Sequence, residues 1–330
     1  MVLRGVYILL LLSLNCFAFA QYPRFLIEGA AQGTSYQLQY YAPRELIRKA
    51  EIDSVLRVID RSMSLYEPTS LISAFNNPET LSWFEMDEHM TNVVKRSFEV
   101  HKRSGGMFDI TVKPLVSLWG FGPKRPKQMP ERADIDSALQ FVGMDRLELR
   151  KRKLRKRDGR ISIDLNGIAQ GYSVDVLAGF MERRGIENYI IELGGEIRTS
   201  GHKGGGEPFN VAIERPEGVA ASPFILALRD KAVTTSGSYR RAFDFEGKKI
   251  HHHINPFDGY PLQNDTASVT VIAETAMDAD AYDNVFMALT PEEGIRLADR
   301  LKGIEVYIIH RKDGTFKEVF SKGFLKFIKN

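Results

Sequence analysis

Oxygen-bearing side chains interrupt a small, apolar segment near the C-terminus, AMDADAYDNVFMAL at residues 276–289. They belong to Asp278, Asp280, Asp283 and Asn284. With a helical period of about 3.6 residues, Asp280 and Asn284 lie one turn apart on the same side of a helix. Stacked oxygen donors beside further acids suit a hard cation such as Mg²⁺. The alternative is a solvated first turn, where the helix dipole favours acids, and this segment taken alone favours that alternative.

Three further segments combine glycines with acids. In GGMFDITVKP, Asp109 follows two glycines that let a ligand approach the backbone, and an aspartate that only caps a turn fits equally well. In SIDLNGIAQGYSVD, we expect Asp164 to end a strand, and Gly167 and Gly171 to flank the start of a helix whose N–H groups can bind phosphate. That segment has neither G-x-G-x-x-G nor Walker spacing. ELGGEI, a glycine turn between acids, is a weak signal by itself.

Hydroxyls, arginines and histidines follow one another in TTSGSYRR and HHHINPFDG. Hydroxyl and guanidinium groups suit phosphate oxygens, and they belong to Thr234, Thr235, Ser236, Ser238, Arg240 and Arg241. Adjacent histidines on a strand point to opposite faces, which disfavours a shared zinc ion. A single histidine acting as a general acid or base, or contacting phosphate, fits better. Together these segments predict a phosphorylated ligand held with Mg²⁺.

The elements that must position these groups follow from hydrophobic periodicity. Helical spacing predicts helices over residues 43–66, 89–105, 167–185 and 290–303. Strands are predicted at residues 33–42, 188–195, 208–216, 224–237, 268–274 and 304–311, and a turn at residues 70–77. Helices and hairpins do not alternate strictly. We therefore expect an α+β fold, with mixed helices and antiparallel sheets in a single compact two-lobed unit.

A strongly basic segment, RLELRKRKLRKRDGRISIDL at residues 146–165, raises the alternative of nucleic-acid binding. Leucines fall among the basic residues, and Asp158-Gly159 is a hairpin turn signal, so a β-hairpin with a solvated basic face is favoured. No aromatic residues interleave with the charge to stack on bases. The formal charge of the whole chain is only +3, which gives no strong attraction to nucleic acid or to a membrane surface.

The first 20 residues, MVLRGVYILLLLSLNCFAFA, have the pattern of a secretory signal peptide. Arg4 precedes a short apolar run, and Ala18-Phe19-Ala20 forms a cleavage site, while a retained anchor helix is the alternative. Cys16 is the only cysteine, and Asn15 before it disfavours lipid attachment. Cleavage after Ala20 would leave a mature domain of residues 21–330 without disulfides, zinc thiolates or a cysteine nucleophile. An exported, periplasmic protein is expected.

The order of motifs resembles that of the FAD:protein FMN transferases, the ApbE-type flavin transferases. The resemblance runs from about Gly33 to Leu289 and rests on GTSY, SLYEPTSLISAFN, GGMFDITVKPLVSLWGFG, IDLNGIAQGYSVD, IELGGEI, TTSGSYRR, HHHINPFDGYP and DADAYDNVFMAL. It implies an ApbE- and T-fold-like unit that splits FAD, transfers FMN to a Ser or Thr of a partner protein and releases AMP, with Mg²⁺ on the pyrophosphate. It also implies an extracytoplasmic acceptor, such as a membrane redox subunit, and a possible attachment to the inner membrane.

The resemblance also implies roles for individual residues. The metal ligands would be the Gly167 carbonyl, Asp280 and Asn284, and the catalytic residues would be His252 and Asp280. Flavin contacts would come from Gln32, Tyr66, Met107, Phe108, Asp109, Asp164, Gln170 and Ile254, with Asn76 near the adenine side. The sequence departs from the family at Asn284 for threonine, Gln170 for lysine, Asn255 for aspartate and Gln32 for methionine.

Three alternatives remain open from the sequence. The same site could hydrolyse FAD to FMN and AMP, or it could hold FAD without turnover. A third alternative sets the resemblance aside and takes the chain as an exported binding protein whose acids only face solvent.

Overall fold

A computed structural model describes residues 22–121, 129–213, 215–216, 224–237, 242–245, 248–251 and 253–329. Its largest element is an eight-stranded sheet in the order β1-β2-β6-β7-β10-β13-β14-β15, with every neighbouring pair antiparallel. The strands are β1 (Arg24–Ala31), β2 (Thr34–Tyr41), β6 (Asn188–Leu193), β7 (Glu196–Ser200), β10 (Ala232–Gly237), β13 (Thr266–Ala273), β14 (Glu305–Lys312) and β15 (Thr315–Phe320).

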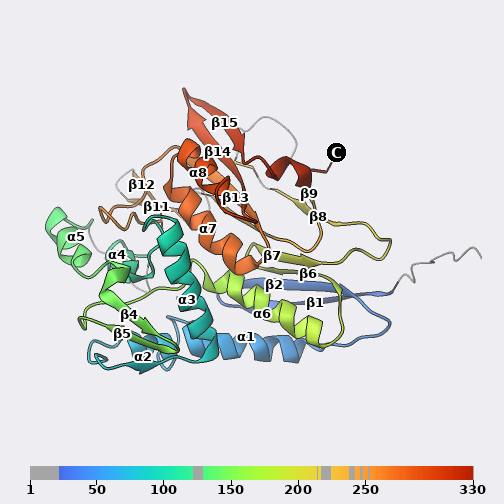
Figure 1. The fold of residues 1–330 in the computed structure, drawn as a ribbon, viewed down its shortest axis with the longest axis horizontal. Coiled ribbons are helices and arrows are strands. Elements are labelled where there is room, and N and C mark those ends of the chain that lie inside the picture. The colour runs from blue at the N-terminus through green and yellow to red at the C-terminus, as the bar shows by residue number, and fades with distance from the viewer. Residues whose placement is uncertain are drawn as a thin grey trace, which may run out of the picture.

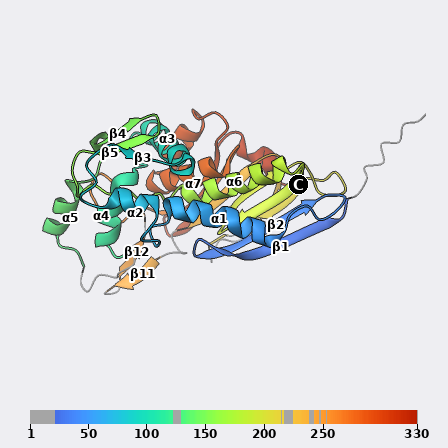
Figure 2. The ribbon, with the colours of Figure 1, turned by 90° about the horizontal axis from the view of Figure 1, so that it is seen from below.

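Helices cover one face of this sheet. Figures 1 and 2 show α1 (Lys49–Met63), α6 (Ala169–Arg183) and α7 (Ala276–Ala288) lying along it, with α3 (Glu88–Arg103) beside them. The hairpin of β8 (Phe209–Ala212) and β9 (Ile225–Leu228) packs on the other face with η3 (Phe324–Phe327). Strand β13 is buried along its whole length because it has apolar neighbours on both faces. Val271 joins the helix-side core, and Ile272 joins the core under β8 and β9.

A second lobe lies at one end of the molecule (Figure 2). It contains a three-stranded sheet in the order β3-β5-β4, formed by β3 (Phe84–Glu85), β5 (Lys153–Lys156) and β4 (Leu147–Arg150). Around it lie α2 (Leu71–Asn76), α4 (Lys113–Leu118), α5 (Arg132–Leu139), η1 (Ile110–Val112) and η2 (Met144–Arg146). The hairpin of β11 (Ala242–Phe245) and β12 (Lys248–His251) and helix α8 (Pro291–Ala298) complete the described elements. The α+β prediction, with helices and antiparallel sheets, is confirmed.

Several local predictions were wrong. The basic segment does form a hairpin, but its turn is at residues 151–152, where Lys151 adopts the left-handed conformation at φ 53°. Asp158-Gly159 follows β5 instead, and Gly159 lies so close to α2 that a Cβ there would be 2.3 Å from the carbonyl oxygen of Pro78. The segment ending at Asp164 is not a strand.

Other element boundaries also differ. Residues 71–76 are helical rather than a turn, because the Ser70 side chain accepts a hydrogen bond from the backbone N–H of Ser73 and caps them. The first predicted helix begins at Lys49, and β1 was not predicted. The predicted capping box at Thr290 and Glu293 is present in α8.

Within the described residues, no helix is both long enough and apolar enough to cross a membrane. The predicted signal peptide, residues 1–20, lies outside those residues and stays a prediction.

Candidate active site between helices α6 and α7

Helices α6 and α7 touch closely because glycine stands at their contact. A Cβ on Gly171 would be 2.2 Å from the carbonyl oxygen of Ala276 and 2.8 Å from Cβ of Asp280. Gly171 lies in the first turn of α6, where backbone N–H groups have no partner within the helix. Its N–H donates to Oδ2 of Asp280 at 2.8 Å. A carboxylate of α7 thus caps α6.

The capping is reciprocal, through a residue that sequence reasoning missed. The carboxylate of Asp175 on α6 accepts hydrogen bonds from the N–H groups of Ala276 and Met277, at 3.0 and 2.9 Å, at the start of α7. Negative charge at a helix N-terminus is stabilised by the macrodipole. The two carboxylates therefore fix how the helices lie against each other. The sequence signal was present, since Asp175 closes the motif SIDLNGIAQGYSVD, but its partners are about 100 residues away.

The three predicted metal-binding residues come together at this contact. Nδ2 of Asn284 donates to the Asp280 carbonyl oxygen at 2.9 Å and lies 3.4 Å from the carbonyl oxygen of Gly167. The side chain of Asn284 thus faces Gly167 from α7. To ligate a cation, the amide must present Oδ1 instead of Nδ2, and the two ends are nearly identical in shape.

Asp283 was named with the acidic segment but left out of the predicted ligand set. It is 2% exposed, accepts from Ser236 Oγ at 2.9 Å through Oδ2, and accepts from Asn284 Nδ2 at 2.8 Å through Oδ1. Burial raises the pKa of its carboxyl well above the ordinary value, and the charge of Glu196 raises it further. A cation nearby would have the opposite effect on this pKa. Glu196 belongs to ELGGEI, which gave only a weak signal.

The residue set fits a hard cation. Gly167, Asp280, Asp283 and Asn284 offer only oxygen ligands once the Asn284 amide is turned, and Mg²⁺ prefers such ligands. No cluster of three or more His, Cys, Asp or Glu side chains with metal-binding geometry occurs in the described part of the chain. A metal site at this contact would therefore need the Gly167 carbonyl and the Asn284 amide oxygen as well as carboxylates.

Asp278, by contrast, has the ordinary role of an acid in a first turn. Its carboxylate forms an ion pair with Arg96 Nε at 2.6 Å, and its N–H is capped by the Thr275 side chain. The interpretation as a solvated helix start therefore holds for Asp278 only in its first-turn position, since its side chain is ion-paired and 16% exposed. It is wrong for Asp280 and Asp283, which are 4% and 2% exposed.

Two of the predicted flavin contacts lie near the start of α6. Gln32, at φ 53° in the β1–β2 turn, donates through Nε2 to Ser173 Oγ at 2.9 Å. Gln170 approaches the β6–β7 turn, where a Cβ on Gly194 would be 3.0 Å from Gln170 Nε2. Both glutamine side chains thus border the α6 end of the candidate site.

The segment before α6 has no regular structure and is held by side chains. The Asn76 side chain forms the hydrogen bonds that a neighbouring strand would otherwise form. Its Nδ2 donates to the Ile163 carbonyl at 2.9 Å, and its Oδ1 accepts from the Ile163 N–H at 2.7 Å. Lys156, which is 2% exposed, donates to the carbonyls of Asn77, Gly159 and Ile161, and burial lowers its pKa to about 8. Sequence reasoning took Lys156 as part of a solvated face. These contacts hold the segment that contains Asp164, three residues before Gly167. Burial raises the pKa of the Asp164 carboxyl.

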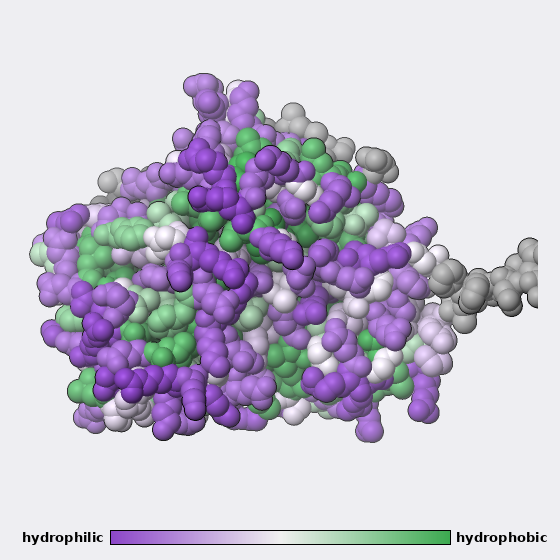
Figure 3. Space-filling view, in the orientation of Figure 1, coloured by the Kyte–Doolittle hydropathy of each residue, from purple (hydrophilic) through white to green (hydrophobic). Residues whose placement is uncertain are grey.

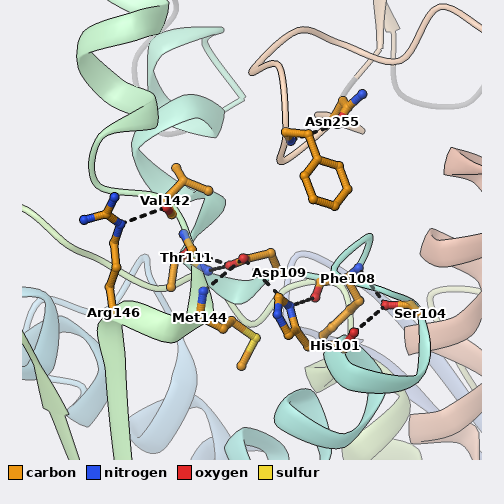
Figure 4. A network of polar contacts seen from close by, with 11 residues as sticks. His101, Ser104, Phe108, Asp109, Thr111, Val142, Met144, Arg146 and Asn255 are labelled. Atoms are coloured by element: carbon orange, nitrogen blue, oxygen red, sulfur yellow. Dashed lines mark hydrogen bonds and ion pairs between the residues drawn. The ribbon is translucent and has the colours of Figure 1, made fainter.

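Asp109 lies in a separate network, shown in Figure 4. Its Oδ1 accepts from the N–H of Thr111 at 2.7 Å and from the Thr111 hydroxyl, and its Oδ2 accepts from the N–H of Met144 at 3.2 Å. His101 Nδ1 lies 3.8 Å from Oδ2 and donates to the Phe108 carbonyl at 2.8 Å. Burial raises the pKa of Asp109, and the Thr111 hydrogen bonds oppose this. The carboxylate thus caps η1 and joins it to η2.

A cavity of about 530 Å³ borders this network, between the end of α3, η2 and the 253–262 hairpin. Phe257 and the glycines 105–106 line it together with Asp109 and Met144. Phe108 is buried beside it, Met107 packs against the main core, and Tyr66 is 69% exposed before α2. The N–H of Asp164 donates to the Ile110 carbonyl at 2.8 Å, so the segment that contains Phe108 and Asp109 lies next to the segment that leads into α6.

The 253–262 hairpin is anchored on the second lobe. Ile254 bridges to Pro261 and packs on the cluster of Leu115, Trp119, Ile135 and Val142. Trp119 Nε1 donates to the Gly259 carbonyl at 2.7 Å. The predicted catalytic residue His252 immediately precedes this hairpin but lies outside the described residues.

Comparison with known proteins identifies the family. The ApbE family model matches residues 32–308. The chain belongs to the ApbE family. Among curated relatives, the FAD:protein FMN transferase of Escherichia coli K12 is 34% identical over 311 residues, covering 92% of this chain and 88% of the relative. The same-named protein of Haemophilus influenzae is 33% identical over 313 residues, covering 91% and 90% of the two chains.

Solved ApbE structures share the fold. The flavin transferase ApbE from Vibrio cholerae superposes with a TM-score of 0.85 at 33% identity, covering 92% of this chain and 99% of that one. The apo flavinyl transferase ApbE from Pseudomonas stutzeri gives a TM-score of 0.84 at 30% identity, covering 92% and 96%. The family predicted from the motifs is confirmed, and so is the fold class of an ApbE protein.

Proposed function

We propose that this ApbE-family chain transfers FMN from FAD to a Ser or Thr hydroxyl of a partner protein, with Mg²⁺ and with release of AMP. Membership in the family makes the chain a flavin transferase. The finer statements, which are Mg²⁺ dependence, the hydroxyl acceptor and AMP as the leaving group, are proposals. The single observation that carries them is the contact between α6 and α7, which brings Gly167, Asp280 and Asn284 together.

The proposed metal ligands are the Gly167 carbonyl, the carboxylate of Asp280 and the amide oxygen of Asn284, with Asp283 as a further carboxylate close by. Bound Mg²⁺ would withdraw charge from the pyrophosphate and stabilise the leaving phosphate. The other contributions to the proposed reaction come from side chains and backbone groups of the chain. The start of α6 would present the positive end of its dipole to the phosphates, while the Gly171 N–H is already bonded to Asp280.

In the proposed reaction, the acceptor hydroxyl oxygen bonds to the phosphorus of the FMN half. The bond from that phosphorus to the bridging oxygen breaks, and AMP leaves with that oxygen. We assign the hydroxyl proton to His252 as general base, a role worth roughly 10²–10⁴-fold in rate. The flavin contacts predicted at Gln32, Tyr66, Met107, Phe108, Asp109, Asp164, Gln170 and Ile254 are part of this proposal, with Asn76 acting through Ile163.

Mass spectrometry tests the proposal directly. A candidate acceptor is incubated with the chain, FAD and Mg²⁺, and a mass gain equal to FMN less one water is expected on a Ser or Thr peptide, with equimolar AMP. FMN and AMP formed equally well without any acceptor, and no mass gain with it, would instead establish hydrolysis. FAD that stays bound through purification without AMP formation would establish a flavin carrier.

We also propose that the chain is exported, with residues 1–20 removed. Edman sequencing of the protein recovered from the periplasm of a bacterial host should then begin at Gln21. A start at Met1 in membrane fractions would favour a retained anchor.

A further inference from the structure

The outer face of the basic segment has no part in the proposed flavin transfer. Residues 146–160 contain nine basic and two acidic residues, a formal charge of +7, whereas the whole chain carries +3. The positive charge is therefore concentrated in one hairpin, and the remainder of the chain is net acidic. Figure 1 shows this hairpin, β4 and β5, at one end of the molecule beside α2.

The register of the three-stranded sheet sorts its side chains into two faces. Glu85 pairs with Lys153, which pairs with Arg150, and Glu148 pairs with Arg155. Because side chains alternate along a strand, these residues share one face. The opposite face carries Phe84, Leu149 and Leu154, which pack against the core. The basic side chains thus point away from the protein interior.

Trp83 lies on the same outer face, two residues before Glu85. The guanidinium of Arg150 lies 4.8 Å from its ring centre, and that of Arg155 lies 4.7 Å away. Leu81, two residues earlier, is 52% exposed. An indole ring with two guanidinium groups within 5 Å of its centre, and an exposed leucine two residues away in the chain, is an apolar feature inside a cationic surface.

Acids neutralise only part of this charge. Glu85 is 3.6 Å from Lys153, and Glu148 is 2.7 Å from Arg155 and 3.8 Å from Arg157. Arg150 and the turn residues 151–152 are exposed and add three more positive charges. Figure 3 shows hydrophilic side chains interspersed with hydrophobic ones over the region where β4 and β5 lie in Figure 1.

We propose that this outer face, formed by Leu81, Trp83, Arg150, Lys151 and Arg155, binds the surface of an anionic phospholipid bilayer. Anionic lipid attracts each nearby Lys or Arg without requiring fixed geometry, which suits cations spread along a hairpin turn. Indole rings reside at the headgroup level of bilayers, and a neighbouring leucine can enter the acyl boundary. Protein interfaces are depleted of lysine but enriched in tryptophan and arginine, so an acidic protein partner is the outcome that the test must separate from a bilayer. The proposal does not depend on FMN transfer.

The fluorescence of Trp83 provides the test, because the chain has only two tryptophans and the other, Trp119, is 4% exposed. The full chain is mixed at low salt with vesicles of phosphatidylglycerol and phosphatidylcholine, or of phosphatidylcholine alone. Anionic vesicles should shift the emission to the blue and reduce acrylamide quenching severalfold, and high salt should reverse both. Trp83→Phe should remove the response. Any binding through the apolar N-terminal segment would occur with both vesicle types. The difference in the Trp83 response between the two vesicle types therefore measures the contribution of charge.

A charge-reversal pair supplies the matched control. Arg150→Glu with Lys151→Glu should weaken binding to anionic vesicles by about 30-fold or more, given the contribution of each basic residue near such a surface. Lys312→Glu with Lys317→Glu makes the same charge change on the exposed β14–β15 hairpin and should have little effect. Equal effects of the two pairs, or Trp83 quenching unchanged by anionic vesicles, would overturn the proposal. Protection of Trp83 by polyglutamate but not by vesicles would also overturn it, in favour of an acidic protein partner.

Discussion

Two buried carboxylate clusters of this molecule both accept hydrogen bonds from protein donors but differ in the charged groups around them. Asp109 receives hydrogen bonds from Thr111 and Met144 and lies near His101, so the protein itself provides its donors. Asp283 also accepts hydrogen bonds, from Ser236 and Asn284, but another acid, Glu196, lies in its neighbourhood and the Asn284 amide also faces the Gly167 carbonyl. Crowding oxygen atoms around a buried acid is costly unless a cation is bound. Asp109 is therefore a carboxylate that stabilises the fold, whereas the group of residues around Asp283 is suited to binding Mg²⁺.

The largest effect is expected at Asp280. Asp280→Ala and Asp280→Asn should each lower FMN transfer by about 10³-fold or more, as expected when charge stabilisation is lost at a reacting centre. Asn retains an acceptor for the Gly171 N–H, so its fold should persist. Transfer is measured by mass spectrometry of the acceptor, with Asp278→Asn on the same helix as the control. Near-normal Mg²⁺-dependent transfer by the Asp280 variants would remove the metal assignment.

Asp283→Asn sharpens the comparison through metal binding. We expect the Mg²⁺ concentration for half-maximal activity to rise by about tenfold or more, equivalent to about 1.4 kcal/mol of lost cation interaction. Unfolding by urea without Mg²⁺ should show unchanged or greater stability, because a buried charge beside Glu196 is removed. A loss of stability with unaltered Mg²⁺ dependence would place Asp283 in the same class as Asp109.

Asp109→Asn should behave in the opposite way. The amide cannot accept from the Met144 N–H through its nitrogen, so we expect a loss of about 2 kcal/mol in the free energy of unfolding. The half-saturating Mg²⁺ concentration should stay the same. Denaturant titration measures the first quantity and activity titration the second, and FAD affinity measured in parallel tests the predicted flavin contact. A raised Mg²⁺ requirement would break the distinction between the clusters.

The smallest effect concerns pH. Because the pKa of Asp283 is raised by folding, the folded protein holds this proton more tightly than the unfolded chain does. Its contribution to stability therefore falls as pH rises from the ordinary carboxyl pKa to the raised one, by up to about 1.4 kcal/mol per pH unit. Urea titrations from acidic to neutral pH, without Mg²⁺, should show this slope in the native chain and a smaller slope in Asp283→Asn. Identical slopes would contradict it.

Local patterns were sufficient for some of the regular elements. The apolar spacing of α3 and the capping box of α8 were correctly predicted, because short-range propensity and tertiary packing favour the same conformation there. The predictions failed where side chains replaced backbone pairing. Residues 161–165 look like a strand, yet Asn76 and Lys156 supply the hydrogen bonds that a neighbouring strand would give. Asn76 and its partner Ile163 are 87 residues apart, so no local rule detects them.

The order of motifs in the sequence was enough to determine the family and the fold class, because a family pattern records residue types directly. It also predicted Gly167, Asp280 and Asn284 as metal ligands, and the structure brings these three residues together. Only the tertiary structure decided which acids are buried together. It paired Asp278 with Arg96, enclosed Asp283 beside Glu196, and made Asp175 and Asp280 cap each other's helices. Burial and electrostatic environment depend on segments that are distant along the chain, and a linear pattern does not contain those distances.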